Sequence, residues 1–457
     1  MNEERKVKSN KEFDLFFCFG RTSILKQIMK KHLKSIGPAI VVAAVVLGPG
    51  SILTSSKVGA SFGLLGVPVI ICSTILMIAM VALAARIGVV YEGSPCDELA
   101  ARLGRPVAIA IGAILFTLIA FFQSSNNIAL IGGLEPMFGN ESLGLGAKCA
   151  LLLAVNGLLI TSLYKLRNLY GSVEQFMKLL VGLMALAFLI NFLVIFSQPR
   201  GYEPVASVES RDWIPLLGMI ATTFSVAGAF YQAYLVKEKG WGLGEARKGA
   251  FDSMVSISIL GLTTCIILLT AWRCFHSHPD AVTLASVGDV ARQLEPLFGS
   301  AAKIIFCTGI LAGALSSFLV NAMIGGTVMS DGLGKGYRLE DRWPLHLTTV
   351  ALLVGMLVGM AAMAKEGSTV LLITLAQAFT VIGIPALALA LVYLGTRKDL
   401  KGERKVPKPI LGLAVLGFLV SCVLACLTAR KVWDKFHPPD KSVAWSSDQP
   451  EKKSGMG

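Results

Sequence analysis

Long apolar segments dominate this chain and determine the environment in which it can fold. Of its 457 residues, 54% are hydrophobic and 16% are charged, with a mean hydropathy of +0.68, which is too apolar for an ordinary soluble domain. A helix of about 17 to 25 apolar residues crosses the roughly 30 Å hydrocarbon core of a bilayer. Eleven such segments lie near 37–62, 66–90, 106–133, 147–164, 172–197, 214–236, 251–272, 299–328, 345–364, 369–394 and 409–428. We therefore expect an all-α integral membrane protein with about 11 transmembrane helices.

The first segment is interrupted at its centre by Gly48-Pro49-Gly50-Ser51. Proline has no amide donor and glycine weakens a helix, so a helix here breaks and leaves carbonyl groups without donors inside the hydrocarbon. The sixth segment has small and polar residues at the same depth, from Thr222 to Ala229. Paired interruptions in corresponding positions indicate a five-plus-five inverted repeat, with a binding site between broken helices 1 and 6.

This repeat divides the chain into two halves and three smaller parts. Residues 36–197 form the first half-repeat and residues 214–394 the second, while residues 409–428 form a peripheral eleventh helix. Residues 1–35 form a basic N-terminal tail and residues 431–457 a polar C-terminal tail. Neither tail is long enough to form a soluble domain of useful size.

The distribution of basic residues indicates the orientation and the partners. Nine Lys and Arg residues precede the first span, which favours a cytoplasmic N-terminus and a multi-pass protein of the cell membrane. The net charge of +13 is spread along loops, which argues against a nucleic-acid partner. We expect the partners to be the lipid bilayer and a transported ion or small solute. The sequence shows no cofactor motif and no nucleophile–base pair, so neither a cofactor nor an enzymatic activity is expected.

Polar residues within the spans are the candidate functional residues, because they are costly in a membrane. The candidate substrate-binding residues are Gly48, Pro49, Gly50, Ser51, Ser225, Ala227, Gly228 and Gln377. A polar pathway would contain Gln123, Asn126 and Asn321. The alternative for the serines and threonines is a hydrogen bond between neighbouring helices, and for Gly48-Pro49-Gly50 a structural kink.

Acidic residues are missing at mid-membrane depth in the spans expected to line the site. A cation would be held by carbonyls, hydroxyls and amides, and the tentative ligands are Gly48, Ser51, Ser225 and Gln377. This is not a conventional ligand set for a divalent ion, which normally uses carboxylates or soft donors.

Several short motifs are spread along the spans. They are Gly37-Pro38-Ala39, Gly48-Pro49-Gly50-Ser51 and Val58 to Gly63 in the first span, Ala84 to Val90, Leu235-Val236, Gly326 to Gly332, and Leu375-Ala376-Gln377 through Ile384-Pro385. Together they resemble the Nramp family of divalent metal transporters. The resemblance implies the inverted-repeat fold that this family shares with amino-acid transporters, with its two broken helices.

The functional side chains of the family are mostly replaced at the matching positions. The resemblance places its metal-binding aspartate on Gly48, its asparagine on Ser51, and its Met-Pro-His motif on Ser225-Val226-Ala227. Its third-helix acids, implicated in proton movement, fall near Gln123 and Asn126. The Pro-Gly break and Gln377 are retained. Loss of the thioether, the acids and the histidine removes the soft ligand, the main negative charge and the titratable groups.

Three hypotheses follow. The first is a cation transporter of the Nramp-related class for a hydrated ion such as Mg²⁺, with little proton coupling. The second is a transporter of a small organic solute such as an amino acid, since a half-helix N-terminus free of acid favours a carboxylate. The third is a non-transporting membrane sensor that keeps the fold.

Overall fold

The computed structural model describes residues 37–137, 143–166, 168–199, 213–278, 287–365 and 368–436, together with residues 203 and 284. The two predicted tails lie almost entirely outside these ranges. The helices are α2 (Ala39–Val46), α3 (Pro49–Phe62), α4 (Gly66–Val90), α5 (Pro95–Leu103), α6 (Arg105–Leu134), α7 (Leu145–Lys165), α8 (Leu169–Ser197), α9 (Ile214–Thr223), α10 (Val226–Glu238), α11 (Ala246–Phe275), α12 (Val287–Gly332), α13 (Arg342–Ala364), α14 (Ser368–Gly395) and α15 (Lys408–Phe436). Short 3-10 turns lie at Gly63–Leu65, Glu135–Met137, Leu243–Glu245 and Gly402–Arg404. Within the described ranges every regular element is helical.

The eleven predicted spans all fall on these helices. Nine helical stretches of the described chain are long and apolar enough to cross a membrane. One of them, Pro49–Val90, joins part of the first predicted span to the second, and the tenth span contributes a shorter apolar stretch, Thr380–Gly395. Helix α5 was not predicted. It begins at Ser94, whose side chain accepts a hydrogen bond from the Asp97 amide.

Both predicted interruptions are real breaks in the helices. Leu47 and Gly48 separate α2 from α3, and Phe224 and Ser225 separate α9 from α10. Helix α2 contacts α10, whereas α3 contacts α9, so the two broken helices run antiparallel, as an inverted repeat requires.

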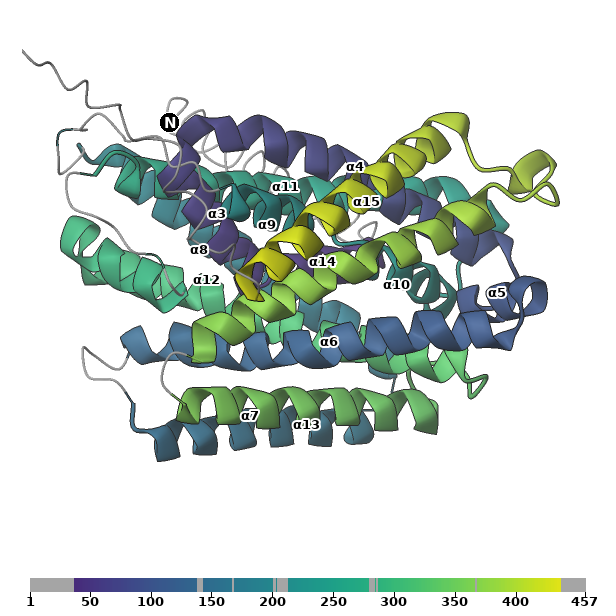
Figure 1. The fold of residues 1–457 in the computed structure, drawn as a ribbon, viewed down its shortest axis with the longest axis horizontal. Helices are drawn as coiled ribbons and strands as arrows, with labels where there is room; N and C mark the ends of the chain where they lie inside the picture. The colour runs from purple at the N-terminus through teal and green to yellow at the C-terminus, as the bar shows by residue number, and fades with distance from the viewer. Residues whose placement is uncertain are drawn as a thin grey trace, which may run out of the picture.

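The other helices surround this pair. Helix α11 packs along α3 and α4, and α12 packs along α6, α8 and α13. Helices α7 and α13 lie side by side at one margin of the molecule, while α15 lies against α14 and α4 (Figure 1). Large apolar side chains project outward from these outer helices, as a surface solvated by lipid allows: Leu158, Leu179, Leu262 and Leu357 are all more than 60% exposed.

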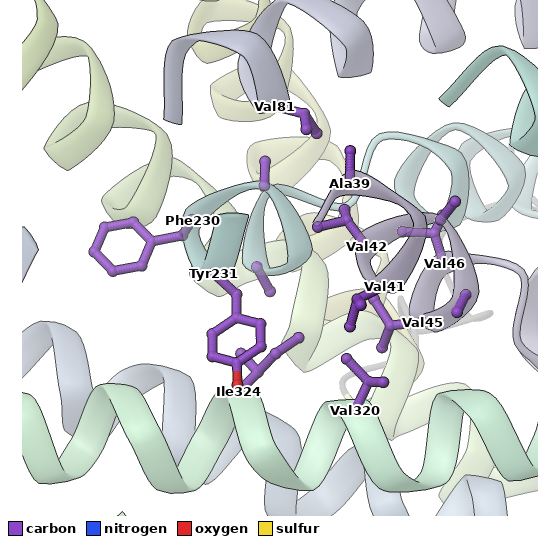
Figure 2. Close-up of a cluster of buried hydrophobic side chains, with 14 of the residues drawn as sticks. Ala39, Val41, Val42, Val45, Val46, Val81, Phe230, Tyr231, Val320 and Ile324 are labelled. Carbon is purple, nitrogen blue, oxygen red and sulfur yellow. The ribbon is translucent and has the colours of Figure 1, made fainter. Parts of the chain in front are cut away.

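Helix α2 is short, apolar on every side and completely buried, and its position depends on its neighbours. Figure 2 shows its valines between α10 and α12, with Val45 on the side of Val320. Its N-terminal end is held by the carboxylate of Asp252 on α11. The Gly37 amide donates to Oδ1 at 2.7 Å and the Ala39 amide to Oδ2 at 2.8 Å.

We predict that Asp252→Ala lowers the free energy of unfolding by about 2–3 kcal/mol, because two buried amides lose a charged acceptor. Asp252→Asn should have an intermediate effect, since one acceptor oxygen remains. Titration with SDS in mixed micelles measures this difference. Asp399→Ala is the control: Asp399 is exposed, and its hydrogen bond from Arg102 lowers the pKa of its carboxyl group but holds no helix end. Equal effects of the two alanine variants would contradict the prediction.

Candidate functional site

The break between α2 and α3 follows directly from the sequence of the segment. In a continuous helix, the Val45 carbonyl would accept a hydrogen bond from the amide of residue 49, but that residue is Pro49. Gly48 adopts an extended conformation, with φ −80° and ψ 178°, and α3 then begins at Pro49. Proline suits this first helical position because its amide would be unpaired there anyway.

Two serine hydroxyl groups donate to carbonyls that the break has freed. The Ser51 hydroxyl donates to the Val46 carbonyl at 2.6 Å, and the Ser316 hydroxyl of α12 donates to the Ala44 carbonyl at 3.0 Å. The Gly48 carbonyl accepts the Ser51 and Ile52 amides at 3.0 and 3.2 Å, so it belongs to the first turn of α3. In this conformation, Ser51 and the Gly48 carbonyl therefore stabilise the broken helix.

Gly48 also lies against α12 with no space for a side chain. A Cβ atom at this position would lie 2.6 Å from Oγ and 2.8 Å from Cβ of Ser317. Glycine therefore allows α12 to approach the break closely. An aspartate at position 48, where the resemblance places the family's metal ligand, would need α12 or the break to move.

The second break differs from the first because its polar side chains are less engaged. Ser225 is partly exposed and makes no capping hydrogen bond to α10. The buried Thr223 hydroxyl has no partner within the described part of the chain. Thr222 is partly exposed and lies 3.1 Å from Thr54, oxygen to oxygen, which links α9 to α3. The Thr222 hydroxyl also donates to the Met219 carbonyl at 3.2 Å, so Ser225 is the side chain at this break that is best placed to contact a solute.

Ala227 and Gly228 are buried in the contact between α10 and α2. A Cβ atom on Gly228 would lie 3.2 Å from Val42 and 3.3 Å from Val45. In this conformation the two residues set the packing of the half-helices. The side chain of Gln377 lies outside the described residues, although its backbone belongs to α14.

The predicted pathway residues form one hydrogen-bonded group between α6 and α12. Gln123 donates to the Phe318 carbonyl at 2.6 Å, and Asn126 donates to Oε1 of Gln123 at 2.6 Å. Asn321 donates to Ser317 at 2.9 Å, and the Ser317 hydroxyl lies 3.4 Å from Oδ1 of Asn126. Since Ser317 also contacts Gly48, this group reaches the first break.

Two further buried amides were not predicted from the sequence. Gln232 on α10 and Asn191 on α8 are both 0% exposed, and neither amide has a hydrogen-bond partner among the described residues. An unpaired amide is expensive in a membrane interior. Each stands among apolar and aromatic neighbours, apart from the polar residues elsewhere in its span, so a search for clusters of polar residues overlooks it, whereas a search for isolated amides would find it.

A carboxylate group lies at one end of the bundle instead of at the breaks. Asp331 accepts hydrogen bonds from the Ser94 hydroxyl at 2.6 Å, the Tyr234 hydroxyl at 2.7 Å and the Cys96 amide at 3.2 Å. These contacts join α5, α10 and α12. Burial raises the pKa of the Cys96 thiol well above its usual range, so this cysteine packs as a neutral group.

Acidic and histidine side chains are missing from the spans around the breaks. The predicted spans 37–62, 106–133, 214–236 and 299–328 contain no Asp, Glu or His. No group of three or more His, Cys, Asp or Glu side chains that could hold a metal ion occurs in the described part of the chain. A cation at these breaks would meet backbone carbonyls, hydroxyls and amides.

Two antiparallel broken helices within a helical, lipid-facing bundle define a multi-pass membrane protein with the inverted-repeat transporter fold. The family model described as natural resistance-associated macrophage protein-like matches residues 39–430. The chain therefore belongs to the Nramp family.

Relatives and solved structures agree with this assignment. The divalent metal cation transporter MntH of Acidiphilium cryptum is 24% identical over 405 residues, covering 83% of this chain and 86% of the relative. MntH of Yersinia pestis is 24% identical over 424 residues, covering 88% and 96%. A manganese transporter of Eremococcus coleocola has a similar fold, with a TM-score of 0.73 at 19% identity over 91% of this chain and 90% of that one. MhsT in complex with L-phenylalanine gives a TM-score of 0.54 at 15% identity over 86% and 98%.

We predict that Gly48→Ala destabilises the protein by about 1–3 kcal/mol, since the new methyl group would overlap Ser317. Ser317→Gly in the same chain should recover part of this loss, giving a coupling free energy of about 1 kcal/mol or more. Unfolding of the single and double variants in SDS measures the coupling. Gly182→Ala on α8 is the control, because a Cβ atom there meets nothing within 4 Å. Additive effects of the two substitutions would contradict direct contact at the break.

Proposed function

We propose that this chain transports a divalent cation that keeps much of its hydration shell, such as Mg²⁺, with little proton coupling. The supporting observation is the combination of Nramp family membership with the absence of Asp, Glu and His from the four spans around the breaks. Relatives of this chain are named divalent metal cation transporters. Mg²⁺ gives up its waters reluctantly, so hydroxyl and carbonyl oxygens can hold it through those waters.

The binding segment in this proposal lies between the two breaks. It comprises Gly48, Pro49, Gly50, Ser51, Ser225, Ala227, Gly228 and Gln377, with the partly exposed Ser225 hydroxyl as the first contact of the ion. The hydrogen-bonded group of Gln123, Asn126 and Asn321 would line the polar route. All three are amides, which do not titrate, so they offer no proton relay. We also propose a cell-membrane location with a cytoplasmic N-terminus, in keeping with the basic N-terminal segment.

Reconstitution in liposomes tests the substrate. We expect saturable entry of Mg²⁺, and a weaker preference for Mn²⁺ over Mg²⁺ than a site with a thioether ligand would show, because hard oxygen ligands do not select transition metals. Trapped dyes for the metal and for pH should report cation entry without acidification. If neither Mg²⁺, Mn²⁺ nor any other divalent ion moves down a gradient, the proposal is wrong. Acidification that accompanies metal entry would refute only the claim on proton coupling.

The contribution of Ser225 is tested by substitution with alanine, which removes the hydroxyl group and adds no bulk. We expect Ser225→Ala to reduce the initial rate of Mg²⁺ entry about tenfold, as expected when one contact of roughly 1.4 kcal/mol is lost. Ser162→Ala is the matched control, because Ser162 lies on the outer helix α7 and donates only to its own helix. Equal rates for the two variants would remove Ser225 from the site.

A second candidate, transport of a small organic carboxylate such as an amino acid, rests on the two half-helix N-termini. Neither Gly48 at the start of α3 nor Ser225 at the start of α10 provides a side-chain cap. The first amides of both helices therefore point toward the breaks, where a partial positive charge favours an anion. Thermal unfolding in the presence of amino acids, Mg²⁺ or Mn²⁺ separates the candidates: stabilisation by amino acids alone favours this one.

A further inference from the structure

The loop between α14 and α15, residues 396–408, has a large excess of positive charge. It contains six Lys and Arg residues and two acidic residues. Two other segments at the same end of the bundle are closer to balance: residues 333–342 contain three basic and two acidic residues, and residues 237–248 contain four and two. Figure 1 shows the loop projecting from the end of the molecule where α5 lies. Among these three segments, it is therefore the one that attracts anions most strongly.

A contact with α4 holds the backbone of this loop. Arg86 of α4 donates hydrogen bonds to the carbonyls of Glu403 and Lys405, the latter at 3.1 Å. Within the loop, the Arg404 amide donates to the Lys401 carbonyl at 3.1 Å, in the 3-10 turn Gly402–Arg404. A loop that is already ordered loses less conformational entropy on binding. The basic side chains are therefore carried on a backbone whose conformation is already set.

The acidic residues of the loop interact with arginines. Asp399 accepts hydrogen bonds from Arg102 of α5 at 3.0 Å and from Arg397 at 3.4 Å. The hydrogen bond from Arg102 lowers the pKa of the Asp399 carboxyl group. Glu403 interacts electrostatically with Arg86. Five exposed basic side chains of the loop make no ion pair within the described part of the chain, and they are Lys398, Lys401, Arg404, Lys405 and Lys408.

An apolar stripe on the outer surface of α15 begins next to this loop. Its members, three or four residues apart and so on one face of the helix, are Leu413, Leu416, Leu419 and Val423. Their exposed fractions are 36%, 48%, 53% and 58%. Helix α15 begins at Lys408, so the stripe starts within about two turns of the last basic residue of the loop. This surface thus combines cationic side chains at one end with an apolar face that continues into the membrane.

We propose that the loop and this stripe form a binding site for anionic phospholipids, with the headgroup phosphate at the loop and the acyl chains along α15. A cluster of Lys and Arg residues directly beside a membrane-spanning helix attracts anionic lipids. A zwitterionic lipid is attracted less, because the cation in its headgroup offsets the phosphate. A soluble anion would contact the loop alone, whereas a phospholipid also covers the apolar stripe.

The position of the loop in the chain places it on a defined side of the membrane. Ten predicted spans precede it, so it lies on the same side as the N-terminus. With the cytoplasmic N-terminus proposed above, the loop faces the cytoplasmic leaflet, whose anionic lipids attract basic segments. A bound lipid would hold the end of α14 and the start of α15 at the membrane surface. Binding of this lipid does not depend on which ion or solute the protein transports.

Thermal unfolding of the purified full-length protein in detergent tests the proposal. Phosphatidylglycerol is the anionic probe, and phosphatidylcholine and inorganic phosphate are the comparisons. We expect phosphatidylglycerol alone to raise the unfolding temperature, with a saturable dependence and an apparent affinity that falls as NaCl screens the charges. A triple variant, Lys401→Gln, Arg404→Gln and Lys405→Gln, should weaken this affinity about tenfold or more, because each basic residue contributes to the attraction.

The matched control is a second triple variant, Lys165→Gln, Arg247→Gln and Lys248→Gln. It removes the same charges from exposed positions at the same end of the molecule, outside the loop. An equal loss of affinity in both triple variants would show that only total charge matters and would refute the site. Equal responses to phosphatidylglycerol and phosphatidylcholine would refute it as well, and an equal response to inorganic phosphate would refute a lipid as the ligand.

If the loop variant fails to fold, protection of lysines in the unmodified protein replaces it. Phosphatidylglycerol has no amine, so acetylation followed by peptide mass spectrometry reports on the lysines of the protein alone. We expect the lipid to slow acetylation of Lys401 and Lys405 severalfold and to leave Lys165 and Lys248 unchanged. Equal rates at Lys401 and Lys405 with and without the lipid would overturn the proposal.

Discussion

The structure depends on how a helix that breaks within a membrane provides hydrogen-bond partners for its backbone groups. Hydrocarbon provides no water to pair with freed carbonyls, and each unpaired group costs several kcal/mol. Here one donor comes from the same segment, Ser51, and another from a different helix, Ser316 of α12. The position of α2 is therefore linked to α12 through the chemistry of the break. Any motion of α2 away from α12 must replace the Ser316 hydrogen bond with another partner for the Ala44 carbonyl.

The two breaks are related by the repeat, but they differ in how many of their polar groups form hydrogen bonds within the protein. At the first, serine hydroxyls donate to the Ala44 and Val46 carbonyls, and Gly48 is in close contact with Ser317. At the second, Ser225 is partly exposed and makes no capping bond. An incompletely paired break is the better location for a solute, since a solute can provide the missing partner. The contact between Thr54, one turn after the first break, and Thr222 links the two breaks.

The sequence predicts the large features well, because each rests on one strong physical constraint. Hydrophobic length locates the spans, and Pro49 with its flanking glycines locates the first break. The direction of a side chain is harder to predict, because a serine within a broken span can form a hydrogen bond either with a solute or with its own backbone. Only the structure shows that Ser51 donates to Val46. Helix α5 was missed because it is amphipathic and short, and Gln232 because a lone amide carries little pattern.

The absence of carboxylates from the breaks limits the chemistry of any ion held there. A carboxylate provides a full negative charge, whereas a helix end provides about half of one. Removing water from a divalent ion costs far more than removing it from a monovalent ion, because the hydration energy grows with the square of the charge. The broken helices therefore offset little of the dehydration cost of Mg²⁺. A divalent substrate held at the second break, where Ser225 is partly exposed, would keep its waters.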